Sequence, residues 1–155
     1  MLYLDASVLI KKYLNEKGSQ AIASRFESGE KIFTSTLSYG EVHASIGRKF
    51  RSRELDRGEL TRLREEFESD WLFSLSVLEL DLRTMSALPR LVEKYSLRAG
   101  DAIHLSAAFW LIDSFRLGIV GALPEEFVEF GVADRRLSEV AIECGLLVFN
   151  PERQN

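Results

Sequence analysis

Short apolar runs alternate with helix-like segments along the chain, and this alternation constrains its fold more than any other feature. The apolar runs that we expect to form strands are 1–5, 31–34, 74–80, 127–133 and 146–149. The segments that we expect to form helices are 7–13, 19–28, 37–50, 82–95, the stretch from Asp101 onward, and 134–144, with a loop at 118–124. Strands that alternate with helices form parallel sheets whose crossovers cover both faces. The sequence therefore predicts a three-layer α/β/α fold with a central parallel five-stranded sheet.

The composition limits the class of protein. The chain has 155 residues, 46% of them hydrophobic and 28% charged, which is typical of one globular domain. No apolar run approaches the roughly 18 residues of a membrane helix, and the single cysteine, Cys144, cannot form an internal disulfide. We therefore expect one domain over 1–155, located in the cytoplasm and without a membrane partner. Acids outnumber bases by 24 to 20, so net charge alone argues against a nucleic-acid partner.

A carboxylate stands at the head of an apolar helix in 97–105, Leu-Arg-Ala-Gly-Asp-Ala-Ile-His-Leu. From Ala102 onward, apolar residues recur at spacings of three and four, the pattern of a helix with one buried stripe. Asp101 begins that stripe, and Gly100 allows a tight turn before it. Taken alone, Asp101 is an ordinary N-cap that accepts hydrogen bonds from the first turn. Its relation to other acids decides between capping and a functional role.

Three further acids are placed where they are expected to meet Asp101. Ligands bind at the carboxyl ends of the strands in an open parallel sheet, and Asp5 and Asp134 follow the first and fourth expected strands. Glu41 lies on an otherwise apolar or small helix face, where an unpaired carboxylate is costly, although a solvent-exposed Glu is an alternative. Four converging acids raise one another's pKa values or attract a cation. Oxygen ligands suit Mg²⁺ or Mn²⁺, which favours metal-dependent hydrolysis of a phosphodiester.

Other chemistries find little support. The sequence contains neither the glycine fingerprint of dinucleotide-binding folds nor a P-loop. His104 lies one turn after Asp101 and is expected to support a carboxylate or a backbone group, because imidazole is a softer ligand than a magnesium site prefers. A metal-dependent phosphatase of similar build is an alternative, but the Asp-x-Asp motif of the haloacid-dehalogenase type is here Asp5-Ala6-Ser7.

Six short motifs occur in order along the chain and are together more specific than any one of them. They are Leu-Asp-Ala-Ser-Val-Leu-Ile-Lys (4–11), Leu-Ser-Tyr-Gly-Glu-Val (37–42), Leu-Arg-Ala-Gly-Asp-Ala-Ile-His-Leu-Ser-Ala-Ala (97–108), Ala-Asp-Arg-Arg-Leu (133–137), Gly-Leu (145–146) and Asn-Pro (150–151). This ordered set resembles the PIN domain, and most nearly the VapC-type toxins of bacterial and archaeal toxin–antitoxin pairs. The resemblance covers nearly the whole chain.

The resemblance implies a sheet of order 3-2-1-4-5 and a Mg²⁺- or Mn²⁺-dependent endoribonuclease that is the toxin of a type II pair. By motif position the catalytic acids would be Asp5, Glu41, Asp101 and Asp134. Of these, Asp5 and Asp101 would be the direct metal ligands. The resemblance thus assigns chemistry to the same four acids that the strand ends and helix faces single out.

Two positions beside these acids qualify the resemblance. Ser7 matches a small hydroxyl residue that helps to hold the site in the family, and it is also an ordinary N-cap residue. Val132 stands where the family usually has Thr or Ser, two residues before the fourth acid. A PIN-like RNA-binding module with weakened catalysis is therefore an alternative to an active nuclease.

The charged segment 48–70 is expected to form a helical arm, with Gly58 between two helices, and it carries two candidate binding features. Four basic residues could hold an RNA backbone or simply be a solvated helix end: Arg48, Lys49, Arg51 and Arg53. The resemblance also implies an antitoxin that wraps the toxin, and a homodimer or higher toxin–antitoxin assembly. A narrow apolar stripe either binds the antitoxin helix or packs the arm on its own domain: Leu55, Leu60, Leu63 and Phe67.

Overall fold

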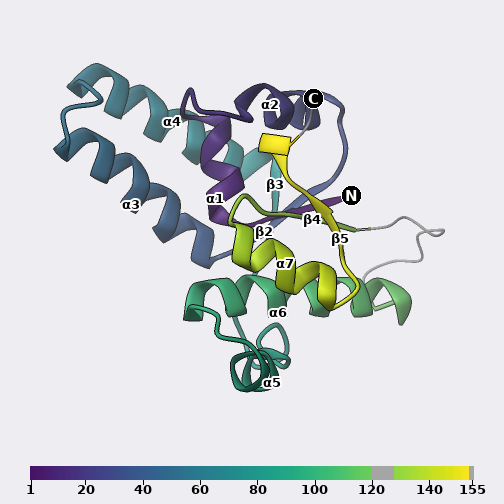
Figure 1. The fold of residues 1–155 in the computed structure, drawn as a ribbon. Helices are drawn as coiled ribbons and strands as arrows, with labels where there is room; N and C mark the ends of the chain where they lie inside the picture. The colour runs from purple at the N-terminus through teal and green to yellow at the C-terminus, as the bar shows by residue number, and fades with distance from the viewer. Residues whose placement is uncertain (120–127, 154–155) are drawn as a thin grey trace.

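The computed structural model of the chain describes residues 1–119 and 128–153. Five short strands form a sheet of order β3-β2-β1-β4-β5 (Figure 1). The strands are β1 (Leu2–Leu4), β2 (Ile32–Ser35), β3 (Leu75–Leu78), β4 (Glu129–Gly131) and β5 (Leu147–Phe149). Every neighbouring pair is parallel. The expected parallel sheet and its strand order are confirmed.

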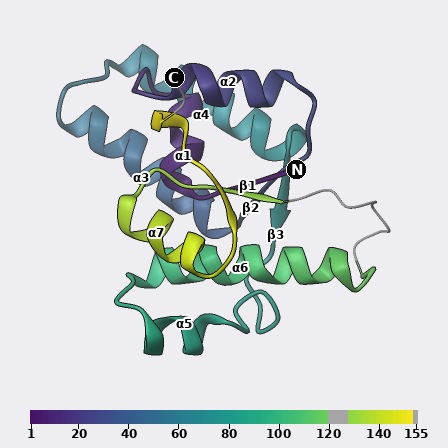
Figure 2. The same ribbon diagram turned by 45° about the vertical axis from the view of Figure 1, so that its right-hand side comes forward.

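Helices cover both faces of this sheet and complete the three layers (Figure 1, Figure 2). One face carries α1 (Ala6–Leu9), the 3₁₀ turn η1 (Ile10–Lys12), α2 (Ser19–Glu27), α3 (Leu37–Arg51) and α4 (Arg57–Phe73). The other face carries α5 (Leu88–Lys94), α6 (Ala99–Arg116) and α7 (Arg135–Glu143), and a second 3₁₀ turn, η2 (Pro151–Arg153), follows β5. Within the described residues, no helix has the length and apolar character that crossing a membrane requires.

Side chains alternate along β1 and so divide the core between the two faces. Leu2 and Leu4 point into an apolar cluster with α1 to α4, whereas Tyr3 points into a second cluster with α5, α6 and α7. All three side chains are fully buried, as expected for a parallel strand covered on both sides. This alternation has a consequence for the site, because it turns Tyr3 toward α6 and leaves Asp5 at the carboxyl end of the strand.

Two expected boundaries differ from the structure. Residues 81–87 form bends and turns, and the expected helix begins only with α5, whose first turn contains Pro89. Proline is tolerated there because a first-turn amide has no partner within the helix. The fourth strand spans three residues in the described part of the chain, a shorter segment than the expected 127–133. Its first expected residue and most of the loop expected at 118–124 lie outside the described residues.

Helices α3 and α4 lie side by side and extend away from the sheet as the expected arm (Figure 1). The break between them is at 52–56, and the expected break at Gly58 is wrong, because Gly58 lies in the first turn of α4. Asp56 caps α4 and forms a reciprocal capping box with Glu59. Satisfied amides at this cap, rather than the glycine, determine where the helix begins.

The apolar stripe of the arm is part of the chain's own core. Leu60, Leu63 and Phe67 are 3%, 1% and 0% exposed and belong to the cluster on the α1 to α4 face. Leu55 is half-buried against the same cluster. The expectation that this stripe receives a partner helix is therefore wrong, because its apolar surface is already removed from water. The alternative, that the stripe packs the arm on its own domain, is confirmed.

Candidate active site

Asp5 directly follows β1 and caps α1. Its carboxylate accepts a hydrogen bond from the amide of Val8 at 3.0 Å, and the Ser7 hydroxyl lies 2.7 and 2.9 Å from its two oxygens. The residue is only 4% exposed. Burial away from water raises the pKa of Asp5 to about 6, although these hydrogen bonds and the charge of His104 oppose the shift. Asp5 is thus a carboxylate held in one orientation at a place that disfavours its charge.

Ser7 connects Asp5 to the segment after β4. Its hydroxyl, which donates to Asp5, also accepts a hydrogen bond from the amide of Ala133 at 3.3 Å. The next residue, Asp134, is exposed and caps α7 by accepting from the amide of Leu137 at 2.8 Å. β1 and β4 are neighbours at the point where the strand order reverses, which is the usual ligand-binding edge of an open α/β sheet. Asp5 and Asp134 therefore flank that edge.

Glu41, in the second turn of α3, reaches toward the start of α6. Its Oε2 atom accepts a hydrogen bond from Nε2 of His104 at 2.8 Å. Its Oε1 atom lies 3.1 Å from the position that a β-carbon on Gly100 would occupy. Gly100 is within the first turn of α6, so its role is to leave room for Glu41 rather than to allow a tight turn before the helix. Glu41 is consequently directed inward and is not simply a surface residue.

Asp101 is the third residue of α6, and the interpretation of this residue as the N-cap is wrong. The N-cap is Arg98, whose side chain makes no capping hydrogen bond. Partial burial raises the pKa of Asp101 and the charge of Asp134 raises it further, while the charge and the backbone amide of Arg98 lower it. Asp101 and Asp134 are thus close enough for their charges to interact.

The structure places the four acids in two interacting pairs, Asp5 with Glu41 and Asp101 with Asp134, and His104 interacts with Asp5 and with Asp101. The charge of Glu41 raises the pKa of Asp5, as that of Asp134 raises the pKa of Asp101. Among the described residues, none of the four forms a salt bridge with a lysine or an arginine, and the side chain that contacts Glu41 is the His104 ring. The site is an acidic cluster whose charges are left largely unpaired.

His104 is held between Glu41 and β1. Its Nδ1 atom lies 3.0 Å from the hydroxyl of Tyr3 and 3.5 Å from that of Ser35. Tyr3 is fully buried and His104 nearly so. Both ring nitrogens are therefore occupied by protein groups, which fits a supporting role for His104. Tyr3 and Ser35 were not predicted as site residues; the alternation of side chains along β1 is the one sequence signal that indicates that Tyr3 faces α6.

The donor chemistry of the site suits a hard divalent cation held partly by water. Within residues 1–119 and 128–153, no three Asp, Glu, His or Cys side chains are grouped so as to hold a metal ion by themselves. Mg²⁺ commonly takes one or two carboxylates and keeps several waters, so it does not need a closed protein cage. The raised pKa values of Asp5 and Asp101 indicate carboxylates whose charged forms a cation would stabilise. The residues fit such an ion.

Comparison with known families decides the identity of this arrangement. The sequence model of the PIN domain matches residues 2–112. The chain belongs to the PIN domain family. The family expected from the ordered motifs is confirmed, and the match contains three of the four acids: Asp5, Glu41 and Asp101. Asp134 lies beyond the matched range, so its assignment depends on the geometry described above.

Individual PIN relatives resemble the chain over nearly its full length. Ribonucleases VapC45 and VapC49 of Mycobacterium tuberculosis, from strains CDC 1551 / Oshkosh and ATCC 25618 / H37Rv, are each 29% identical to it over 148 residues, or 96% of this chain and 94% of theirs. FitAcB from Neisseria gonorrhoeae has a TM-score of 0.66 at 14% identity, covering 99% of this chain and 100% of that one. VapBC2 from Rickettsia felis, bound to a promoter DNA fragment, has a TM-score of 0.63 at 9% identity, covering 97% and 98%. The solved structures support the PIN fold.

Val132 marks a departure from the usual PIN pattern. Its side chain is fully buried in the cluster on the α5 to α7 face, where it contributes packing. The hydroxyl that contacts this segment comes instead from Ser7, through the amide of Ala133. The β4 end of the site is thus tied to Asp5 without a hydroxyl at position 132.

The basic cluster expected to bind RNA is not brought to the acidic site. Arg48 follows Glu41 by seven residues on α3, which is roughly 10 Å along a helix. Lys49 is engaged by Glu16 and Glu54 at 3.2 and 2.9 Å. The two remaining members are exposed near the tip of the arm: Arg51 and Arg53. The structure favours the alternative of a solvated helix end.

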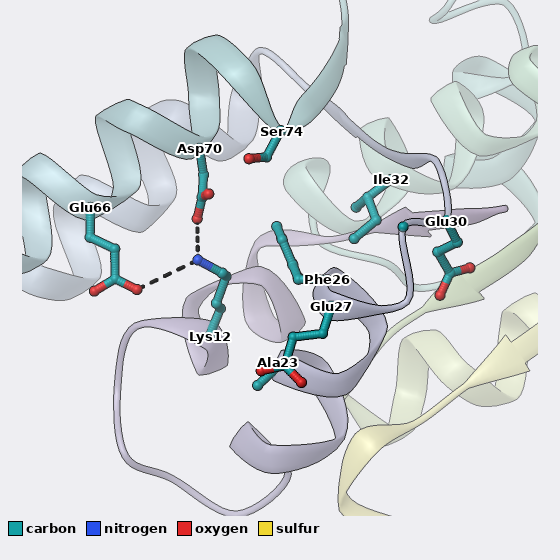
Figure 3. A pocket seen from close by; sticks show the side chains of 10 residues that line it. Lys12, Ala23, Phe26, Glu27, Glu30, Ile32, Glu66, Asp70 and Ser74 are labelled. Atoms are coloured by element: carbon teal, nitrogen blue, oxygen red, sulfur yellow. Dashed lines mark hydrogen bonds and ion pairs between the residues drawn. The ribbon is translucent and has the colours of Figure 1, made fainter.

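A separate pocket lies between α2 and α4 and is crossed by Lys12 (Figure 3). Lys12 pairs with Asp70 and lies 3.5 Å from Glu66, both on α4. The hydroxyl of Tyr13 also donates to Asp70 at 2.9 Å. None of the four acids of the site described above lines this pocket in the described part of the chain. Its charged groups join the first helices to the arm.

Proposed function

We propose that this chain is a divalent-metal-dependent endoribonuclease and the toxin component of a type II toxin–antitoxin pair. The observation that carries the proposal is the convergence of four acids without a lysine or arginine salt bridge in the described residues: Asp5, Glu41, Asp101 and Asp134. Like charges gathered in this way are costly unless a cation neutralises them. With a cation bound, the same pocket attracts a phosphate that the bare acids would repel.

Asp5 and Asp101 are the proposed ligands of a Mg²⁺ or Mn²⁺ ion. When bound, such an ion supplies a Lewis acid for the phosphodiester and makes a bound water more acidic. Ser7 and the amide of Val8 fix the direction of the Asp5 carboxylate before the substrate arrives. This preorganisation matters because a ligand that must reorient during the reaction contributes less to catalysis.

Glu41 and Asp134 are the proposed groups for handling the attacking water. The hydrogen bond from His104 to Oε2 fixes Glu41 and leaves Oε1 free of a hydrogen-bond partner in the described residues, so Oε1 is the proposed acceptor of the water's proton. Asp134 lies at the exposed rim, where its charge interacts with Asp101. It completes the acidic site on the side from which the RNA would enter.

Substrate and partner are inferred from relatives. Two relatives that align with nearly the whole chain carry the name ribonuclease VapC, which supports RNA as the substrate. VapBC2 is a complex on promoter DNA, which supports a partner protein. We infer that this partner is an antitoxin and that the toxin works within a homodimer or a larger toxin–antitoxin assembly. An RNA substrate and the free thiol of Cys144 both suit the cytoplasm.

Arg98 is the proposed contact for the RNA backbone in place of the cluster at 48–53. It is exposed at the start of α6, and its charge lowers the pKa of Asp101, so it lies beside the acidic site. Arginine binds phosphate through charge-assisted hydrogen bonds that fix the register of a nucleic acid without reading its sequence.

The test uses the purified chain freed of any bound partner. RNA is incubated with the chain and a chelator, and then with Mg²⁺ or Mn²⁺ in excess. We expect cleavage only after metal is added, strongly reduced cleavage by Asp5→Asn, and full cleavage by Asp70→Asn, which alters an acid outside the site. The proposal is rejected if the parent cleaves no RNA with either metal, or if Asp5→Asn cleaves as well as the parent.

A PIN-like RNA-binding module with weakened catalysis is the second candidate, and Val132 is the observation that favours it. A buried valine supplies no hydroxyl at the Asp134 end of the site. This candidate predicts that the chain retards RNA in a gel in the presence of Mg²⁺ while leaving the RNA intact, whereas the nuclease predicts loss of the intact RNA.

A further inference from the structure

A hydrogen-bonded path runs from the interior of the sheet to the acidic site. The hydroxyl of Tyr3 lies 3.0 Å from Nδ1 of His104, and Nε2 of His104 lies 2.8 Å from Oε2 of Glu41. The three residues come from β1, α6 and α3, and their pairs are separated by 101 and 63 residues in the sequence. A path that joins three elements in this way is set by the tertiary fold and not by local capping.

We propose that Tyr3 is a positioning residue of the acidic site, whose hydroxyl fixes the ring of His104 so that His104 fixes the carboxylate of Glu41. The inference rests on the ribonuclease function proposed above and assigns to a buried strand residue a role in that reaction. Tyr3 does not touch the substrate. It acts only through His104.

The proton positions follow from the chemistry of the three groups. A carboxylate has only acceptor atoms, so the contact with Glu41 requires a proton on Nε2 of His104. The hydroxyl of Tyr3 is a donor as well as an acceptor, so with His104 neutral it donates its proton to Nδ1 across the 3.0 Å contact. The partner of one imidazole nitrogen determines the role of the other. Tyr3 thereby sets His104 as a donor toward Glu41.

Burial makes the hydroxyl of Tyr3 difficult to replace. Tyr3 and His104 are 0% and 3% exposed, so bulk water has little access to the ring nitrogen. Ser35 is the other hydroxyl near Nδ1, but at 3.5 Å it is a weak partner. The Tyr3 ring also stacks on Phe130 with centroids 5.7 Å apart and meets the His104 ring edge-on at 6.1 Å. Tyr3→Phe therefore removes the hydroxyl and retains the ring packing.

Glu41 is the residue of the path whose side-chain conformation most needs a restraint. Its side chain is 39% exposed, and a glutamate with that freedom samples several rotamers unless a partner restrains it. His104 is its hydrogen-bond partner in the described structure, and the missing β-carbon of Gly100 leaves space at the other oxygen. Loss of the Tyr3 hydroxyl should therefore broaden the positions of Glu41 without removing any group from the site.

Steady-state cleavage of an RNA substrate by Tyr3→Phe is the first measurement. We expect kcat to fall about 10-fold, the scale found for residues that orient active-site ligands, with KM within about twofold of the parent value. Tyr13→Phe is the matched control, because Tyr13 is 6% exposed and its hydroxyl donates to Asp70 at 2.9 Å outside the site. Equal losses of kcat in the two variants would overturn the proposal, because both would then reflect a general loss of stability.

A double-mutant cycle tests whether Tyr3 acts through His104. His104→Gln keeps an N–H donor for Glu41, so we expect it to retain more activity than His104→Ala. In the His104→Gln background, Tyr3→Phe should cause almost no further loss, since the ring on which it acts is gone. A further loss of about 10-fold, as in the parent background, would show that Tyr3 acts independently and would overturn the proposal.

Nitrogen NMR of the imidazole rings supplies a readout that needs no RNA cleavage. The chain has only two histidines, and His43, which contacts Glu68 at 3.0 Å, serves as an internal reference. Tyr3→Phe should shift the Nδ1 resonance of His104 and leave both resonances of His43 in place. Unchanged His104 resonances would overturn this proposal whatever the activity. A shifted resonance in a chain that cleaves no RNA would support the path and reject the ribonuclease function instead.

Discussion

Two groups of acids in this molecule have opposite surroundings. On α4, Asp70 pairs with Lys12, which also lies 3.5 Å from Glu66 (Figure 3). Asp70 also accepts a hydrogen bond from the hydroxyl of Tyr13 at 2.9 Å. At the carboxyl edge of β1, Asp5 is held by the Ser7 hydroxyl and a backbone amide, with no lysine or arginine salt bridge among the residues described.

The difference separates structural acids from acids held for chemistry. A cation beside Asp70 compensates its charge, so this cluster stabilises the junction of the first helices with the arm. Neutral donors beside Asp5 fix its direction and leave much of its charge uncompensated. Such an arrangement lowers stability in the free protein and is retained where a ligand will supply the missing charge. The two clusters should therefore respond in opposite ways to the same substitution.

The largest contrast is expected between Asp5→Asn and Asp70→Asn. Asp5→Asn should lower RNA cleavage about 10³-fold while raising the free energy of unfolding near neutral pH, because it removes a desolvated charge. Asp70→Asn should leave kcat unchanged and lower the free energy of unfolding by about 2 kcal/mol, because Lys12 loses its nearest partner. Cleavage assays and urea unfolding of the same preparations measure both. A similar stability loss in both variants would contradict the distinction between the clusters.

The pH dependence of stability is the next largest effect and isolates Asp5. Its pKa is raised by burial from 3.8 to about 6 in the folded chain. Between these values the folded state keeps a proton that the unfolded state has released, so the free energy of unfolding falls as pH rises and levels off above about 6. The fall amounts to about 3 kcal/mol. Urea unfolding in chelator between about pH 4 and about pH 7 should show this slope in the parent and a smaller slope in Asp5→Asn; parallel curves would contradict it.

The four acids were predictable because they depend on features that a sequence carries directly. Asp5 and Asp134 follow short apolar runs, and parallel topology brings the ends of such runs to one edge. Asp101 was located at the start of its helix, although its exact cap position was wrong by three residues, since Arg98 is the N-cap. Topology therefore predicted which acids meet, and local hydrogen bonding decided how each one is held.

Other features depend on long-range packing and were missed or misassigned. The contact between Tyr3 and His104 spans 101 residues, and no local spacing fixes the direction of either ring. The stripe containing Leu63 and Phe67 was read correctly as one face of a helix, but its pattern is the same whether that face meets the core or a partner. The sequence predicts that an apolar face is covered; the tertiary structure shows what covers it.

Substitutions of single arginines should show a smaller contrast: an arginine beside the acidic site should contribute more to RNA binding than one at the tip of the arm. Arg98→Ala should raise KM for RNA about fivefold and weaken the dependence of KM on salt, because a phosphate contact beside Asp101 is lost. Arg51→Ala, which removes another exposed arginine at the end of α3, should change KM less than twofold. Cleavage kinetics at several salt concentrations measure both. If Arg51→Ala raised KM more than Arg98→Ala, the RNA would bind at the arm and the proposed role of Arg98 would be rejected.

The smallest expected effect tests whether the space beside Glu41 serves catalysis. A β-carbon on Gly100 would lie 3.1 Å from Oε1 of Glu41, and the carboxylate cannot move freely because His104 holds its other oxygen. Gly100→Ala should therefore lower kcat about threefold, or roughly 0.6 kcal/mol. Alanine is the better helix former by up to about 1 kcal/mol, and crowding against Glu41 offsets part of this gain in the free energy of unfolding.

Gly40→Ala is the control that makes this result interpretable. Gly40 is exposed on α3, next to Glu41 in sequence, and a β-carbon there would meet no other side chain within 4 Å. This variant should gain the full helix-propensity term, about 1 kcal/mol in the free energy of unfolding, and keep the parent kcat. If Gly100→Ala also kept kcat, the restraint of Glu41 would be unnecessary for cleavage. If only Gly100→Ala lost activity while both gained stability, the glycine in α6 would be a further position, like Asp5, where the chain retains a less stable residue for the benefit of the acidic site.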